Sequence, residues 1–277
     1  MIRHPCFDEK AHRVVGRLHL PVAPRCNVQC AYCDRRYPCV NENRPGTACR
    51  LISPEEAPEY VAMALTLEPR IEVIGVAGPG EPLANEETFQ ALSRVRESFP
   101  GLRFCLSTNG LLLKERLPDL ISLGVQFLTV TVNAATLETA SKFYLWVRYQ
   151  GKKLTGEEAA EALLSSQMEG LRAAARLGIR VKVNTVLVPG INDAEVGEIA
   201  RRVWEAGAHL MNIIPLLPLG RFHGRRPPTE IELSWARRLA SRFMPQFLSC
   251  RRCRADAAGI PGEGDSLQTI LWAATSS

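Results

Sequence analysis

The chain has 277 residues, of which 46% are hydrophobic and 23% charged, a composition typical of a globular protein. Its formal net charge is +5, and its 34 basic residues are scattered rather than gathered in the basic stripe that would favour nucleic-acid binding. The polar N-terminus has no apolar segment of a secretory signal, and no run of residues is apolar and long enough to span a membrane. We therefore expect a cytosolic protein that binds neither nucleic acid nor membranes.

Short β-type runs alternate with longer amphipathic segments along the chain. Such alternation predicts a parallel sheet with helices outside it. Six strand–helix units predict an α/β fold, an open, partial (β/α)6 barrel. The expected strands cover residues 17–24, 70–77, 102–108, 126–133, 179–188 and 210–216, and the expected helices cover residues 53–67, 85–99, 112–123, 157–177, 193–206 and 230–243.

One domain accounts for the whole chain in this interpretation. Residues 17–244 form the barrel, and residues 1–16 form an N-terminal extension. Residues 245–277 form a tail in which no partner strand is evident. Residues 134–156 fit the alternation worst, and we interpret them as an insertion over the barrel mouth.

Several expected strands have one apolar and one polar face, because successive side chains point to opposite sides of a strand. If the apolar faces pack on helices, the polar faces point into the barrel, where branched apolar residues are usual. A polar interior predicts a charged occupant. The alternative is an ordinary two-faced antiparallel sheet, which the helical spacers disfavour. The polar positions are Arg103, Cys105, Ser107, Asn109, Thr129, Thr131, Asn133, Lys182 and Asn184.

Nine cysteines in a chain expected in the cytosol indicate metal ligands or catalytic groups rather than disulfides. Cys26, Cys30 and Cys33 form a C-x3-C-x-aromatic-C motif after the first strand, with Tyr32 as the aromatic residue. Three thiolates in one loop can hold three irons of a 4Fe–4S cubane and leave the fourth iron open. S-adenosylmethionine (SAM) can chelate such an iron. Zinc sites usually have C-x2-C pairs and four protein ligands, so zinc is the weaker alternative.

This motif resembles that of the radical SAM superfamily, in which the residue at the position of Tyr32 lies near the adenine. Residues 75–82 lack the dinucleotide-binding spacing but resemble the Gly-Gly-Glu-Pro segment of that superfamily. Gly78, Gly80 and Glu81 are therefore expected to bind the SAM amino group. Taken alone, these residues fit a turn or a cap about as well. Polar residues at the carboxyl ends of the following strands complete the expected SAM site: Ser107, Thr108, Asn109, Asn133 and Asn184.

The remaining cysteine and histidine motifs resemble those of the NifB family of nitrogenase cofactor maturases, from about residue 4 to 265. Asn43 and Glu81 depart from the residues usual in that family, and no NifX-like domain follows, so we expect its short form. The resembling segments are residues 4–6, 11–12, 33–39, 41–46, 142–147, 156–160, 167–170, 183–193 and 250–259.

The resemblance implies two further 4Fe–4S clusters, bound as substrates. One would be held by His12, Cys39 and Cys105, and Glu42 would be a labile ligand or proton acceptor. The other would be held by Cys6, Cys250 and Cys253. Without the family, Cys105 fits a small buried hydrophobe, His12 a surface histidine and the Cys250/Cys253 pair a zinc site. Cys49 is interpreted as structural, and no role is assigned to His19, His209 or His223.

The activity implied by the resemblance is methylation of a bound cluster and radical abstraction of hydrogen from that methyl. Fusion of two clusters around the resulting carbide, with one extra sulfur, would then give an eight-iron precursor. The implied partners are iron–sulfur cluster donors, cofactor carriers or scaffolds, and an electron donor such as ferredoxin. The alternatives are another radical SAM enzyme with auxiliary clusters, such as a peptide modifier, and a non-catalytic iron–sulfur scaffold or electron carrier.

Overall fold

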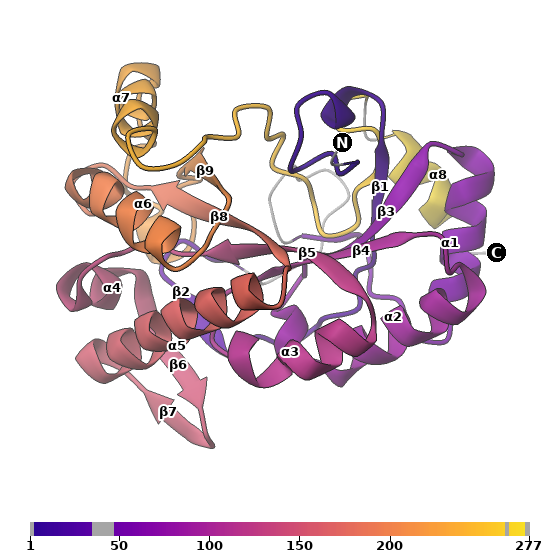
Figure 1. Ribbon diagram of the computed structural model, residues 1–277, viewed down its shortest axis with the longest axis horizontal. Coiled ribbons are helices and arrows are strands. Elements are labelled where there is room, and N and C mark those ends of the chain that lie inside the picture. The colour runs from indigo at the N-terminus through magenta and orange to yellow at the C-terminus, as the bar shows by residue number, and fades with distance from the viewer. Residues whose placement is uncertain (1–2, 35–46, 264–265, 275–277) are drawn as a thin grey trace.

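The computed structural model describes residues 3–34, 47–263 and 266–274 (Figure 1). Six parallel strands lie side by side in chain order in one curled sheet. The expected partial (β/α)6 barrel is therefore confirmed. The strands are β1 (Gly16–His19), β3 (Ile71–Val76), β4 (Arg103–Thr108), β5 (Val125–Thr131), β8 (Arg180–Leu187) and β9 (Leu210–Pro215).

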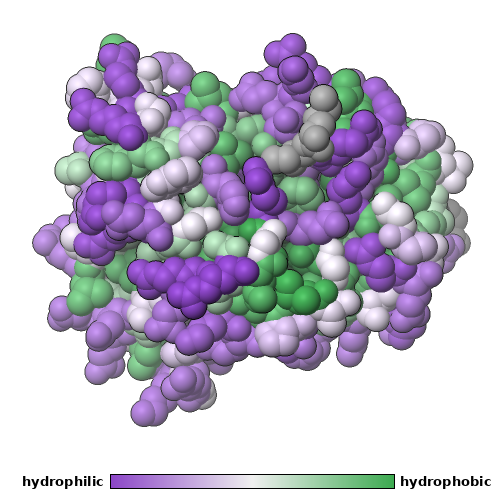
Figure 2. All heavy atoms as spheres, in the orientation of Figure 1, coloured by the Kyte–Doolittle hydropathy of each residue, from purple (hydrophilic) through white to green (hydrophobic). Residues whose placement is uncertain are grey.

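One helix follows each of these strands or precedes the next, and together they cover the outer side of the sheet (Figure 1). Apolar residues of the helices and the outward side chains of the strands form the main core, which includes Leu92, Phe104 and Leu128. Figure 2 shows hydrophobic side chains in the middle of one face, between helices with mainly hydrophilic outer surfaces. The helices are α1 (Ala57–Leu67), α2 (Glu86–Ser98), α3 (Leu113–Ser122), α5 (Gly156–Arg176), α6 (Val196–Glu205), α7 (Glu230–Ala240) and the 3-10 turns η1 (Ala11–Arg13), η2 (Pro82–Ala84) and η3 (Asp193–Glu195).

Two of the expected boundaries differ most from the structure. Helix α1 begins at Ala57 instead of residue 53, because Ser53 and Glu56 exchange hydrogen bonds between side chain and backbone and hold a turn before the helix. Strand β1 ends at His19 instead of residue 24. Pro21 lies just beyond this end and has no amide hydrogen for a strand ladder.

The segment 134–156 is an insertion, as expected, and it adds to the cysteine loop. It contains α4 (Leu137–Phe143) and a hairpin of β6 (Tyr144–Tyr149) and β7 (Lys152–Leu154). Strand β6 pairs antiparallel with β2 (Val28–Cys30), which lies inside the cysteine motif. This second, three-stranded sheet therefore stiffens the loop that carries Cys30.

The tail does pair with the sheet, so the expectation that it has no partner strand was wrong. Strand β10 (Ala258–Gly259) pairs antiparallel with β1, and Gln246 forms a bridge with Met211 at the opposite edge. Helix α8 (Ser266–Ala274) lies against α1, where Trp272 stacks on Tyr60 with ring centroids 5.2 Å apart. The tail thus connects both edges of the barrel sheet.

The polar face of the strands points into the curled sheet, as expected. In β4, Phe104 and Leu106 are buried toward the helices, whereas Cys105 and Ser107 are half-buried on the inner side. The N-terminal coil and the tail lie next to each other on this inner side (Figure 1). None of the helices described is both long and apolar enough to cross a membrane.

Candidate functional site

Three thiols come together in the loop after β1. Burial raises the pKa of the Cys30 thiol well above its ordinary value, and the neighbouring Cys33 and Cys26 raise it further. The side-chain amide of Gln29 donates to the carbonyl oxygens of Cys30 and Cys33, both at 3.2 Å, and holds the loop closed. Among the described residues, no three Cys, His, Asp or Glu side chains are grouped tightly enough for a single metal ion. In a cubane, each thiolate binds a different iron, so the ligands lie farther apart.

Gly80 brings the segment after β3 against this loop. Its amide donates to the Ala23 carbonyl at 2.6 Å, and the Glu81 amide donates to the Arg25 carbonyl at 2.8 Å. A Cβ atom at position 80 would lie 2.0 Å from the Arg25 carbonyl oxygen. Only glycine therefore allows the expected SAM-binding segment to lie beside the cysteine loop.

The Glu81 carboxylate is 3% exposed and joins three parts of the expected SAM site. It accepts hydrogen bonds from the Thr108 hydroxyl at 2.6 Å, the Asn109 amide at 2.7 Å and the Leu83 amide at 3.1 Å. Burial raises the pKa of Glu81 to about 7 even though these donors oppose the shift. The Asn109 side chain also donates to the Asn27 side-chain oxygen at 2.7 Å, which connects this network to the cysteine loop.

Asn133 holds Tyr32 from the end of β5. Its side-chain nitrogen donates to the Tyr32 hydroxyl at 3.1 Å, and its side-chain oxygen accepts from the Val186 amide at 2.9 Å. Asn184 lies elsewhere on the inner side, where its oxygen accepts from the Asn212 side chain at 3.1 Å. Two hydrogen-bonded groups near the cysteine loop therefore contain expected SAM residues, one with Glu81, Thr108 and Asn109 and the other with Tyr32 and Asn133. Ser107 and Asn184 belong to neither group.

The loop after β9 was missed by the sequence analysis. The 3-10 turn η4 (Gly220–Phe222) packs on the cysteine loop, with the Phe222 amide donating to the Ala31 carbonyl at 3.2 Å. A Cβ atom at Gly220 would lie 2.8 Å from the Cys33 carbonyl oxygen, and the residue has a φ of +55°. A glycine just after the last expected strand was the available signal.

A second group of thiols joins the two ends of the chain on the inner side of the sheet. Burial raises the pKa of Cys6 to about 11, and Cys253 and Cys250 contribute to the shift because they lie nearby. The Arg17 guanidinium donates to the Cys253 sulfur at 3.1 Å. The structure thus brings Cys6, Cys250 and Cys253 near one another, and their role as ligands of one cluster stays a prediction.

Cys105 faces a histidine to which the sequence analysis gave no role. His19, Gly75 and Cys105 lie in register on three adjacent strands. A Cβ atom at Gly75 would lie 3.0 Å from the Cys105 sulfur and 3.3 Å from the His19 Nε2 atom, so the glycine lets the two side chains approach. His19 Nδ1 donates to the Arg254 carbonyl at 2.8 Å, which leaves a lone pair on Nε2. Burial and then Arg17 lower the pKa of His19 to about 4.

His12 also has the hydrogen bonding of a metal-binding histidine. Its Nδ1 atom donates to the Pro5 carbonyl at 2.6 Å, and its Nε2 atom is buried without a partner among the described residues. A neutral imidazole with one nitrogen held by a carbonyl is the usual form of a metal-binding histidine. Cys39, Glu42 and Asn43 lie outside the described residues, so their grouping with His12 and Cys105 stays a prediction.

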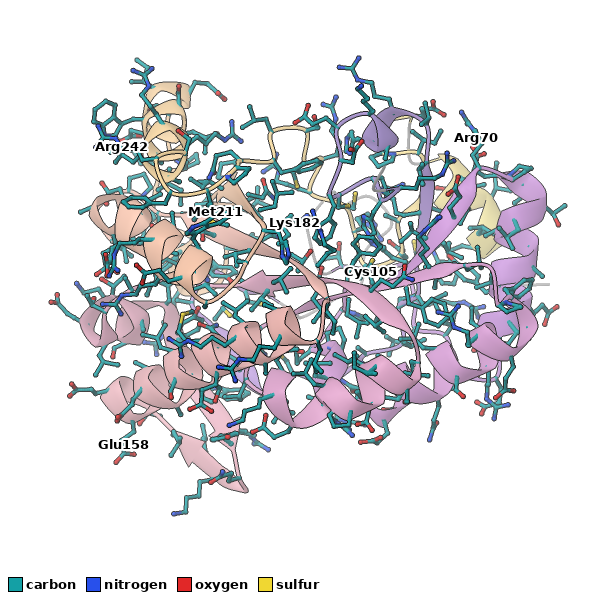
Figure 3. The ribbon with its side chains drawn as sticks, in the orientation of Figure 1. Arg70, Cys105, Glu158, Lys182, Met211 and Arg242 are labelled. Carbon is teal, nitrogen blue, oxygen red and sulfur yellow. The ribbon has the colours of Figure 1, made fainter. Side chains whose placement is uncertain are left out.

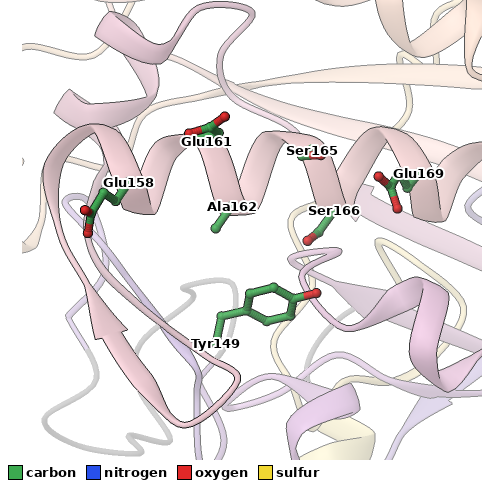
Figure 4. A pocket seen from close by; sticks show the side chains of 7 residues that line it. All are labelled: Tyr149, Glu158, Glu161, Ala162, Ser165, Ser166 and Glu169. Carbon is green, nitrogen blue, oxygen red and sulfur yellow. The ribbon is translucent and has the colours of Figure 1, made fainter.

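A depression in the surface beside α5 is not lined by any of these thiols. It has a volume of about 350 Å³ and lies between α5 and Tyr149 (Figure 4). Glu158, Glu161 and Glu169 make its lining acidic, and none of its lining residues is a cysteine or a histidine. We assign it no role in the chemistry.

Comparison with known proteins identifies the family of the chain. The family described as "Radical SAM superfamily" matches residues 20–203. The chain is 43% identical over 266 residues to "FeMo cofactor biosynthesis protein NifB" of Chlorobaculum tepidum and 44% identical over 271 residues to the protein of that name from Methanocaldococcus jannaschii. These matches cover 95% and 97% of the chain. The chain belongs to the NifB family.

The NifB relatives differ in length. The chain covers 63% of the Chlorobaculum tepidum protein and 58% of a Klebsiella pneumoniae protein with the same name, but 89% of the Methanocaldococcus jannaschii protein. Among solved structures, a radical SAM methyltransferase from Sphaerobacter thermophilus has a TM-score of 0.56 at 20% identity, covering 84% of this chain and 64% of that one. Methylornithine synthase has a TM-score of 0.55 at 18% identity, covering 88% and 66%. At such identities, the similarity shows the shared fold alone.

Proposed function

We propose that this NifB-family chain is an enzyme of nitrogenase cofactor biosynthesis that fuses two bound 4Fe–4S clusters into one eight-iron, carbide-centred precursor. The observation that supports this most is the group of thiols on the inner side of the sheet. Cys6, Cys105, Cys250 and Cys253 come from both chain ends and from mid-barrel, and they form a set separate from Cys26, Cys30 and Cys33. A radical SAM enzyme without further clusters would not need this second set.

Cys26, Cys30 and Cys33 would hold the catalytic 4Fe–4S cluster, which together with SAM supplies a methyl group and a deoxyadenosyl radical. The donor set fits, because the three thiols lie close enough to influence one another's ionisation. The buried Asn27 side-chain nitrogen also has no partner among the described residues, so the loop keeps a spare donor.

Other residues of the chain would orient SAM. Glu81 and the backbone at Gly78 and Gly80 would face its amino group, and Thr108 and Asn109 would keep Glu81 in place. Asn133 would act through Tyr32, whose backbone would lie beside the adenine. Ser107 and Asn184 would bind the carboxylate or ribose from the inner side of the sheet.

The substrate clusters would be held by few ligands. Cys6, Cys250 and Cys253 would bind one cluster and leave an iron open. Cys105, together with His12 and Cys39 as the family resemblance implies, would bind the other. His19 is a further candidate ligand for this cluster, because its Nε2 atom and the Cys105 sulfur both lie beside Gly75 and its Nδ1 atom is held by the Arg254 carbonyl. A sulfide of one substrate cluster would accept the methyl group, and the carbon, after losing its hydrogens, would become the carbide of the fused product with one extra sulfur.

Cluster fusion would also depend on partner proteins. Fusion requires proteins that deliver 4Fe–4S clusters, a carrier or scaffold that accepts the product, and a one-electron donor such as a ferredoxin. The donor would supply the electron that reductive SAM cleavage consumes. The protein itself supplies orientation and electrostatics, while the cofactor carries the chemistry.

Anaerobic reconstitution with an iron count tests the proposal. We expect about twelve irons per chain, four for each of three clusters, and SAM cleavage under dithionite with an eight-iron product detected by electron paramagnetic resonance. Cys26→Ala, Cys30→Ala or Cys33→Ala should abolish all cleavage. About four irons in the wild type would refute the proposal. Cleavage that leaves the additional clusters unchanged would indicate an organic substrate, and loaded protein without cleavage would indicate a scaffold.

A further inference from the structure

Two cationic side chains are buried on the inner side of the sheet without a carboxylate partner among the described residues. Lys182 of β8 is 4% exposed, and Arg17 of β1 is 5% exposed. The remaining buried arginine of the described chain is different, because Arg254 forms an ion pair with Asp256 at 2.9 Å. A buried charge without a counter-charge destabilises the folded state, so two buried cations without a carboxylate partner call for an explanation.

Lys182 is held by groups that stabilise a cation but do not neutralise it. Its ammonium donates to the Cys6 carbonyl at 3.2 Å. It also lies 5.4 Å from the ring centroid of Phe7 and 5.2 Å from that of Phe247. Aromatic faces and a carbonyl attract a cation, yet they leave its full charge in place.

Arg17 is similarly placed on β1, near the opposite side of the sheet from β8. One of its terminal nitrogens donates to the Gly259 carbonyl and the other to the Cys253 sulfur at 3.1 Å. Its Nε atom is buried without a partner among the described residues. Arg17 therefore retains a donor for an anion that would occupy the inner side of the sheet.

The thiols lie near these two cations. Lys182 and Arg17 both favour the ionised form of Cys6, and Lys182 favours that of Cys105, against the effect of burial. Figure 3 shows Lys182 and Cys105 pointing into the middle of the molecule from β8 and β4. The cations and the second set of thiols thus share one part of the structure.

A 4Fe–4S cluster held by thiolates is an anion, and two such clusters side by side repel each other. On the basis of the function proposed above, we propose that Arg17 and Lys182 are the counter-charges that bind the two substrate clusters. Arg17 contacts the cluster held by Cys253. Lys182 lies near both Cys6 and Cys105, where it offsets the repulsion between the two clusters.

Lys182→Met tests this assignment, because methionine keeps the apolar length between the two phenylalanine rings and removes the charge. Iron should fall from about twelve to about eight per chain, or the reduction potential of the substrate clusters should become more negative, since net charge and hydrogen bonds to sulfur set that potential. Lys182→Arg should restore loading. Lys152→Met, which changes an exposed lysine of β7, should behave as the wild type.

Thermal melting of the metal-free proteins separates a binding role from a structural one. Removing an uncompensated buried charge should leave the metal-free Lys182→Met protein at least as stable as the wild type, whereas a structural lysine would lower its melting temperature. The inference fails if that temperature falls, or if Lys182→Met keeps about twelve irons with unchanged potentials. About four irons in the wild type would instead refute the proposed function itself.

Discussion

The Thr108 hydroxyl donates a hydrogen bond of 2.6 Å to the buried carboxylate of Glu81. This bond joins the end of β4 to the segment that follows β3, at the edge of the sheet where the cysteine loop lies. Burial raises the pKa of Glu81 to about 7 in spite of Thr108, Asn109 and Leu83. Glu81 therefore changes its charge near neutral pH, at the position where the SAM ammonium is expected.

SAM affinity should depend on Glu81 and on pH. A carboxylate beside an ammonium adds a charge-assisted hydrogen bond of about 1.5–3 kcal/mol, or about ten- to hundredfold in affinity. We expect Glu81→Ala to lose this affinity with its iron content intact, and wild-type affinity to rise as pH increases through about 7. Calorimetry at pH 6 and pH 8 would check both, with Glu81→Gln as the control that should show no such rise. Equal affinities in all three proteins would count against the site.

Protein stability should show the opposite pH dependence. The raised pKa means that the folded state prefers the protonated carboxyl, so its stabilising contribution is full below about 4.5 and is lost as pH rises to about 7. Relative to Glu81→Gln, the free energy of unfolding of the metal-free wild type should fall by up to about 3 kcal/mol over this range. Urea unfolding at several pH values measures the difference, and a flat profile would contradict the assigned environment.

Gly80→Ala should separate the two segments of the SAM site. The added Cβ atom would meet the Arg25 backbone at 2.0 Å, and a backbone contact cannot be relieved by rotating a side chain. We expect a loss of stability of about 3 kcal/mol or more and at least tenfold weaker SAM binding. Gly101→Ala is the matched control, because a Cβ atom there meets nothing within 4 Å. Similar melting temperatures for the two variants would show that the cysteine loop can move to accommodate the added methyl group, and would contradict this prediction.

The sequence predicted the barrel because each strand and helix has its own periodicity, and it pointed to the cysteine loop because three cysteines lie within eight residues. It failed where contacts depend on tertiary structure. Strand β10 has two residues and no period to detect. Arg17 and His19 could have been found by applying the two-residue alternation to the first strand, as was done for Cys105. Their proximity to Cys253 and Arg254 depends on how the tail returns to β1, which no local pattern encodes.

Asp256 should be essential for holding the tail. It is fully buried and accepts hydrogen bonds from the Cys49 amide at 2.6 Å, from Arg254 at 2.9 Å and from the Trp272 indole at 3.1 Å. Removing one member of a buried ion pair costs about 3–5 kcal/mol, so Asp256→Ala should lower the free energy of unfolding by that amount. A decrease in the free energy of unfolding no larger than that caused by typical surface substitutions would contradict this role.

The same residue should produce an acid-dependent loss of stability. Burial opposes ionisation of Asp256, yet Arg254 and the Cys49 amide hold its pKa below the ordinary value of 3.8. Its contribution is therefore present above that value and is lost as pH falls through the lower, folded-state pKa. Asp256→Asn should remove this acid-dependent part, which acid titrations of the metal-free proteins would measure.

Replacing Cys250 and Cys253 together by serine distinguishes a substrate-cluster site from a structural metal site. If they bind a structural metal, the protein should lose stability, because structural metal binding contributes directly to folding. If they hold a substrate cluster, the barrel should stay folded, since the tail is also held by β10 and by Asp256. About one third of the iron should disappear, and no carbide-centred product should form. Cys105→Ala should remove a different third.

The control for these variants is Cys49→Ser, a residue whose thiol lies beside Arg254 and Asp256 and not among the other thiols. It should keep about twelve irons and the product. Cys6, Cys105 and Cys253 are far apart in sequence, so a single folding defect could not readily reproduce two separate losses of iron. Iron content, electron paramagnetic resonance and thermal melting should be recorded on the same anaerobic samples. A fully loaded Cys250/Cys253 double variant that still makes the eight-iron product would refute the assignment of Cys250 and Cys253 as substrate-cluster ligands, because that cluster would then have to be held elsewhere.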